Sequence, residues 1–154
     1  MMTGMTDTTA VPPLVAQATR RSLAVWVGVA GAAPRAVWHI WHDGSAYLVT
    51  GGLEQALPGA AEGCRAHVIV RSKDRQERVV DWVALVTAVL PGTPAWDEVV
   101  PLLHLRRLNA PDGEEQPARW SRESAIWRLT PTGELLTLTP DEGPPYSPVA
   151  SSST

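Results

Sequence analysis

Short apolar segments separated by turn residues run along most of this chain, and many of them alternate between two faces as β-strands do. The clearest hairpin signal is Asp43-Gly44, a dipeptide that favours a tight turn between antiparallel strands. The pattern predicts strands at residues 23–30, 36–42, 46–50, 65–72, 79–90 and 124–129, and a further edge strand at 134–138. In a chain this short, the pattern predicts a mainly β fold, a six-stranded, mostly antiparallel β-barrel that is closed or split, with short connecting helices.

Helix signals precede or join these strands. Residues 14–22 favour a short helix ahead of the first strand. Thr93 and Pro94 form a typical helix start, a capping side chain followed by proline at the first helical position. Pro101 is expected to kink or divide the helix that follows. Another short helix is expected over residues 53–57.

The distribution of polar residues divides the chain into one domain with two loose ends. Residues 1–13 are polar and residues 139–154 are rich in Pro and Ser, so both ends are expected to be disordered. Residues 14–138 are expected to form the split-barrel domain. Of the 154 residues, 44% are hydrophobic and 19% are charged, which is typical of a soluble globular protein.

Charge and cysteine content narrow the range of partners. The net charge of -3 lacks the basic excess that a nucleic-acid surface needs. The longest apolar run, residues 82–90, is much shorter than the ~20 residues that cross a bilayer. The single cysteine, Cys64, cannot form an internal disulfide, and the first ten residues lack a signal-peptide pattern. We therefore expect a cytoplasmic protein that contacts neither nucleic acid nor a membrane.

Few residues suggest side-chain catalysis or a metal site. Four potential metal ligands follow one another in the sequence: His39, His42, Cys64 and His67. Residues three apart on a strand face opposite ways, so neither pair converges on one ion and zinc is not expected. The sequence contains no G-x-S-x-G, P-loop or G-x-G-x-x-G motif. Asp81 lies within an apolar strand and is expected to pair with Arg71 or Arg78 across the ladder.

Four short motifs occur in a suggestive order. They are W-x-x-W-x-D-G from Trp38, Y-L-V-T-G from Tyr47, V-R-S-K-D from Val70 and A-R-W ending at Trp120. In this order and spacing the chain resembles the pyridoxamine 5′-phosphate oxidase-like, FMN-binding split-barrel superfamily, and more narrowly its small actinobacterial oxidase-related members. The resemblance covers roughly residues 14–129.

The resemblance implies a homodimer that binds FMN or a deazaflavin coenzyme, with a small-molecule substrate, in clefts between the subunits. The second and third strands are then expected along the isoalloxazine ring, the Thr-Gly turn at the phosphate, and a late segment reaching over from the other subunit. The implied cofactor-binding residues are Arg35, Trp38, His39, Thr50, Gly51, Gly52, Gln55, Arg71, Lys73 and Trp120. Because Trp38 and Trp41 point to opposite faces of a strand, at most one of them faces the cofactor.

One position departs from the resemblance. Members of the superfamily usually carry Lys or Arg soon after the Thr-Gly turn, whereas this chain has Gln55 with Glu54 beside it. A carboxylate near a phosphate is repulsive unless it points away. Either Arg71 or Lys73 supplies the positive charge from the next strand, or the ligand binds differently, or the site has lost its ligand.

Three functions therefore stay open. The first is a flavin- or deazaflavin-dependent oxidoreductase, in which the cofactor exchanges a hydride with a small substrate while the protein binds and shields it. The second is a non-catalytic split-barrel dimer that has lost the cofactor site and serves as an interaction or regulatory module. The third is a haem- or tetrapyrrole-binding protein that uses one of the four histidines.

Overall fold

The computed structural model of the chain describes residues 11–22, 24–29, 32–52, 54–71, 78–107 and 113–137. Most of the two ends that were expected to be disordered lies outside the described residues, and so does the predicted site residue Lys73.

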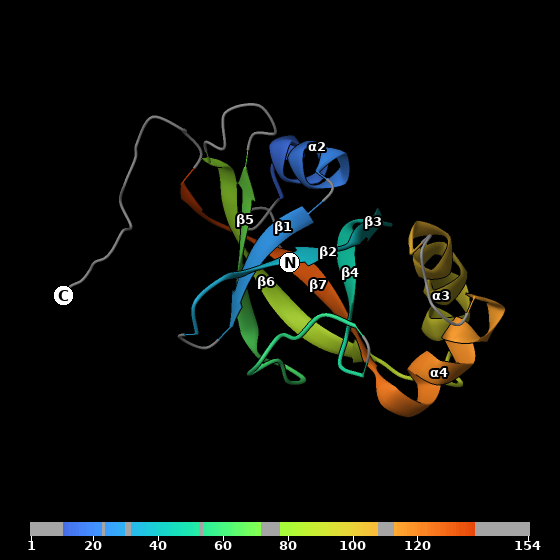
Figure 1. Ribbon diagram of the computed structural model, residues 1–154. Coiled ribbons are helices and arrows are strands. Elements are labelled where there is room, and N and C mark those ends of the chain that lie inside the picture. The colour runs from blue at the N-terminus through green and yellow to red at the C-terminus, as the bar shows by residue number, and fades with distance from the viewer. Residues whose placement is uncertain are drawn as a thin grey trace, which may run out of the picture.

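Seven strands in the described part of the chain form one antiparallel sheet that curls into a nearly closed barrel (Figure 1). The strands are β1 (Ala24–Val29), β2 (Arg35–Trp38), β3 (Ile40–His42), β4 (Ser45–Thr50), β5 (Arg65–Arg71), β6 (Arg78–Val89) and β7 (Ala125–Thr137). Their order in the sheet is β2-β1-β5-β6-β7-β4-β3. The two outermost strands, β2 and β3, are consecutive in sequence, so the chain itself joins the two edges of the sheet at His39.

The predicted fold class is confirmed, with seven strands where six were expected. The strand expected at 36–42 divides into β2 and β3 at His39. The strands expected at 124–129 and 134–138 are one strand, β7. In the sequence, Pro131 suggests the end of a strand, but β7 continues to pair with β6 beyond it. The ladder accommodates this through register shifts and through Gly133, whose φ of 94° is left-handed.

Three α-helices lie in the described part of the chain: α2 (Pro13–Arg21), α3 (Pro94–Arg106) and α4 (Gln116–Glu123), the last preceded by a 3₁₀ turn, η2 (Gly113–Glu115). The predicted cap is confirmed, because the Thr93 hydroxyl accepts a hydrogen bond from the Trp96 amide at 3.2 Å. Pro101 does not divide α3. The helix expected at 53–57 is wrong, since residues 54–57 carry no helix and Gln55 forms an isolated bridge with Thr50.

Two apolar clusters stabilise the domain. The barrel interior is filled mainly by valines from β1, β5 and β6, together with Leu48 and Trp82. The second cluster lies outside the barrel, where Tyr47 and Val49 of β4 pack against α3 and Trp120 of α4. Figure 1 shows α2 across one end of the barrel and α3 with α4 beside β3 and β4. Every residue of β4 is buried, because the strand is covered on both faces.

Among the described residues, no helix is long and apolar enough to span a membrane.

Candidate functional site

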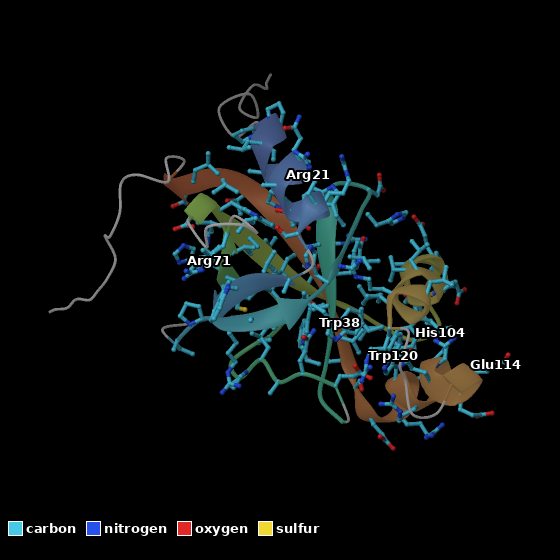
Figure 2. The ribbon with its side chains drawn as sticks, turned by 45° about the horizontal axis from the view of Figure 1, so that its top comes forward. Arg21, Trp38, Arg71, His104, Glu114 and Trp120 are labelled. Atoms are coloured by element: carbon cyan, nitrogen blue, oxygen red, sulfur yellow. The ribbon has the colours of Figure 1, made fainter. Side chains whose placement is uncertain are left out.

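Six of the predicted cofactor residues gather where β2, the turn after β4 and α4 meet. They are Trp38, Thr50, Gly51, Gly52, Gln55 and Trp120. Figure 2 shows Trp38 and Trp120 on this side of the barrel and Arg71 well apart from them. Arg35 is exposed at the start of β2. The structure thus brings together the residues of the turn that the resemblance assigns to a phosphate, whereas Arg71 lies apart from them.

Gln55 fastens this turn to β2. Its carboxamide oxygen accepts a hydrogen bond from the Trp38 amide at 2.8 Å, and its Nε2 donates to the Trp38 carbonyl at 2.9 Å. The side chain therefore pairs with the edge of β2 as another strand residue would, and we call this pair of bonds the Gln55 clamp. Lysine and arginine side chains have no acceptor, so neither could make both bonds.

The glycine pair is explained by contacts within the chain. Gly51 (φ 86°) and Gly52 (φ 61°) both adopt the left-handed conformation that favours glycine. A Cβ on Gly52 would lie 3.2 Å from three atoms of Glu123 and Ser124 at the end of α4. The Gly51 amide donates to the Gln55 carbonyl at 2.9 Å. Backbone conformation and close approach to α4 therefore account for glycine at both positions.

The polar groups at the start of the turn also have partners. The Thr50 hydroxyl accepts a hydrogen bond from Nε1 of Trp127 at 3.1 Å. The Gly51 carbonyl accepts one from the Ser124 hydroxyl at 3.1 Å. Both partners belong to the segment that enters and begins β7, so these bonds hold the turn against the last strand.

Glu54 points away from solvent into a buried charge cluster. Its side chain is 1% exposed and accepts hydrogen bonds from Arg107 Nε (3.1 Å), Arg119 Nη2 (3.2 Å) and Trp120 Nε1 (3.0 Å). Two guanidinium groups and an indole thus neutralise and solvate one carboxylate, as a buried charge requires. We call Glu54, Arg107, Arg119 and Trp120 the Glu54 cluster.

The turn does not fit a phosphate group well in this conformation. The Gly51 amide and the Thr50 hydroxyl are bound to Gln55 and Trp127, and the Gln55 side chain is bound to Trp38. The nearby cations are bound to Glu54. A phosphate would therefore have to displace the bond to the Gln55 carbonyl to gain the Gly51 amide, and the positive charges near the turn are already paired with Glu54.

The two tryptophans of the second predicted strand point to different sides, as expected. Trp41 packs against the barrel interior, where its ring meets Trp82 edge-on with centroids 6.1 Å apart. Trp38 packs against the external cluster with α3. Trp120 is fully buried in that same cluster within its own chain. Of these tryptophans, Trp38 alone combines partial exposure with a place beside the turn.

His39 lies on the inner side of the β2–β3 junction. It is 1% exposed, and its Nε2 donates a hydrogen bond to the Thr19 carbonyl of α2 at 2.8 Å. Burial lowers the pKa of His39 below its usual value, the Thr19 carbonyl acts in the opposite direction, and the positive charge of Arg106 lowers it further. The imidazole is thus held neutral inside the fold.

Other ionisable residues form pairs across the barrel surface. Asp81, which the sequence marked, is 1% exposed and lies 3.6 Å from Nε2 of His67 on β5. Arg71 stacks over the Trp26 ring at 5.1 Å. His42 bonds to Glu98 of α3 at 2.5 Å. In the described part of the chain, no group of three or more His, Cys, Asp or Glu side chains is arranged to hold a metal ion.

Sequence reasoning missed the Glu54 cluster. Its partners lie 53 to 66 residues further along the chain, and the helix that carries two of them was not expected. The sequence did carry a chemical signal. Glu54 lies two residues after the glycine pair, and a carboxylate that is buried needs a cation, which Arg119 could supply.

Comparison with known proteins identifies the fold. No protein-family model and no curated protein matches the chain. HutZ, the haem storage protein from Vibrio cholerae, superimposes with a TM-score of 0.55 at 11% identity, over 82% of this chain and 93% of its own. A putative general stress protein 26 from Jannaschia sp. CCS1 gives 0.52 at 14% identity, over 82% of this chain and 75% of its own. These likenesses show the fold, and the chain shares with both structures a split barrel of antiparallel strands.

Proposed function

We propose that this protein is a non-catalytic split barrel that serves as an interaction or regulatory module. In the flavin-binding superfamily that it resembles, the Thr-Gly turn holds a phosphate, whereas here the turn stabilises the fold. The observation that carries the proposal is the Gln55 clamp, with bonds of 2.8 and 2.9 Å to the main chain of Trp38. The clamp occupies the side chain that is usually basic in the superfamily.

The energetics favour the tie over a phosphate. Leaving a buried donor or acceptor without a partner costs about 1–3 kcal/mol. A phosphate that accepted from the Gly51 amide would leave the Gln55 carbonyl without its present donor. The ligand would also approach Gly52, where the end of α4 already lies within van der Waals distance.

The absorbance spectrum of the freshly purified protein is the first test. The proposal predicts no flavin, deazaflavin or Soret band, and no binding of added FMN or deazaflavin at micromolar concentration. A yellow protein with one flavin per chain would overturn it.

Two substitutions of Gln55 separate the effect of a positive charge on FMN binding from the effect of losing the Gln55 clamp. Gln55→Met removes both bonds to Trp38 without adding charge, whereas Gln55→Lys removes them and adds the cation that is usual in the superfamily. We expect FMN affinity to appear in Gln55→Lys and to be absent in Gln55→Met and in the parent. Equal FMN binding by all three proteins would show that Gln55 does not govern the site.

A second candidate function, haem or tetrapyrrole binding, is favoured by the pair of His67 and Asp81. The imidazole of His67 is 27% exposed on the outer face of β5, and a 1%-exposed carboxylate lies 3.6 Å behind its Nε2. Histidines that ligate metals commonly have a carboxylate in this second position. One structural neighbour, HutZ, is itself a haem storage protein.

Haem titration distinguishes this candidate. Binding through His67 predicts a Soret band that His67→Ala removes and His42→Ala keeps, since His42 lies on β3 against Glu98. A Soret band that survives in His67→Ala assigns the iron to another residue and rejects this site.

We also propose that the protein is a homodimer in the cytoplasm. The superfamily resemblance supports the dimer, and Leu85, 40% exposed on the outer face of β6, adds apolar surface there. The free thiol of Cys64 is compatible with a reducing compartment. Sedimentation equilibrium tests the dimer, and a monomer at micromolar concentration would reject it.

A further inference from the structure

In the described part of the chain, Thr19 ties helix α2 to the barrel by two hydrogen bonds. Its carbonyl accepts from Nε2 of His39 at 2.8 Å, and its hydroxyl accepts from Nε1 of Trp82 at 3.1 Å. All three side chains are buried, each at 1% exposure or less. Val15, one turn earlier on α2, contributes its side chain to the barrel interior. The helix therefore closes one end of the barrel (Figure 1).

The tie to His39 requires one tautomer. A carbonyl can only accept, so Nε2 carries the proton and Nδ1 is the bare nitrogen. Nδ1 is buried and has no hydrogen-bond partner in the described part of the chain. A second proton on this ring would keep the bond to Thr19, so its cost is a buried donor at Nδ1 and a buried charge, for which the described residues provide no acceptor.

The charged groups around His39 also oppose protonation of its ring. From α3, Arg106 places a positive charge that opposes protonation of the ring. On α2 itself Arg20 and Arg21 are exposed at the last turn. From β6, Asp81 pairs with His67 on the outer face of the sheet, whereas Trp82 faces the interior beside Thr19. Among the described residues, no carboxylate hydrogen-bonds or ion-pairs with His39.

We propose that α2 is a proton-released plug of the barrel, held by neutral His39 and let go when this imidazole takes up a proton. The undocked helix has only nine residues and lacks a side-chain cap at its amino end. Helices shorter than about 12–15 residues are marginal in water, so α2 melts once it leaves the barrel. Its departure exposes the interior end that carries Trp82, Trp41 and His39. The inference does not depend on the proposed function.

The expected size of the effect follows from proton linkage. The released state binds a proton at the ordinary histidine value of 6.5, which the docked state resists. One proton therefore weakens docking by up to about tenfold for each pH unit below about 6.5.

Hydrogen exchange measured on the full chain tests the plug. After correction for the intrinsic pH dependence of exchange, the protection of the amides of residues 13–21 should fall by up to about fivefold between about pH 6.5 and about pH 5.5, while β5 and β6 keep theirs. Unchanged protection of α2 over this interval overturns the proposal. Equal loss across α2, β5 and β6 overturns it too, because that is global unfolding.

Two variants identify the titrating group. Gln in place of His39 can still donate to the Thr19 carbonyl but takes up no proton, so His39→Gln should keep α2 protected at both pH values. Thr19→Val removes the bond from Trp82 and keeps the carbonyl, so α2 should lose protection at every pH while the pH dependence remains. The same pH dependence in His39→Gln and the parent would assign release to another group. If His39→Gln fails to fold, NMR titration of the His39 ring in the parent decides the question, because a ring that takes up a proton while α2 stays protected overturns the proposal.

Discussion

Two buried polar ties hold helices to this barrel, and the two ties differ in charge. α2 is held by a neutral imidazole, His39, whose surroundings oppose a positive charge. α4 and the end of α3 are held by an ionised carboxylate, Glu54, under two arginines and an indole. The tie at α2 is sensitive to protonation of one imidazole ring. The tie at Glu54 is sensitive to mutation, because removing any partner leaves a buried charge uncompensated. Acid is therefore expected to act at α2 through His39, and mutation to act most strongly at Glu54.

The largest effect is expected for Glu54→Ala. This substitution leaves Arg107 and the 7%-exposed Arg119 without their carboxylate, and removal of one partner from a buried ion pair typically costs about 3–5 kcal/mol. Urea denaturation measures the free energy of unfolding. Glu98→Ala is the matched control, because that carboxylate is 58% exposed and its pair with His42 contributes under about 1 kcal/mol. Equal losses in the two variants would contradict a special role for the Glu54 cluster.

A smaller effect, about 1–3 kcal/mol, is expected for Gly52→Ala, because strain at a left-handed residue adds to the contacts with Glu123 and Ser124. The variant Gly63→Ala separates the cost of the left-handed conformation from the cost of the contacts. Gly63 has a similar conformation, φ 83°, and open space around its Cβ position. Gly52→Ala should therefore lose more free energy of unfolding than Gly63→Ala. The opposite order would show that the turn is not packed against α4.

Acid should lower stability through His39. A base whose pKa is lowered in the folded state binds fewer protons when folded, so stability is complete above about pH 6.5 and declines as the pH falls below it. The decline is at most about 1.4 kcal/mol for each pH unit. Urea denaturation of the parent and of His39→Gln at about pH 7.5 and about pH 5.5 measures the difference. Parallel declines in both proteins would assign the acid sensitivity elsewhere.

The smallest effect is expected for Ser124→Ala. It removes a single exposed hydrogen bond to the Gly51 carbonyl, worth about 0.5–1.5 kcal/mol. The same denaturation assay measures it. A loss larger than that of Gly52→Ala would mean that this bond, and not the close approach of α4, holds the turn.

Much of the barrel could be predicted from the sequence, because alternation and the Asp43-Gly44 turn are local signals. The opposite orientation of Trp38 and Trp41 followed from strand geometry. The turn could not be predicted. The sequence near residues 53–57 favours a helix locally, but Gln55 pairs with a residue 17 positions away and Glu54 with residues 53 or more away. Long-range polar partners overrode local propensity there.

We propose that the turn between Thr50 and Gln55 serves the fold and binds no phosphate. Equilibrium dialysis of the purified protein against FMN and against riboflavin tests it most directly, because the two ligands share the ring and differ by the phosphate. The account predicts that the phosphate adds no affinity, so that FMN is held no more tightly than riboflavin. An FMN affinity at least about tenfold higher, a difference of about 1.4 kcal/mol, that disappears in Gly52→Ala would contradict it.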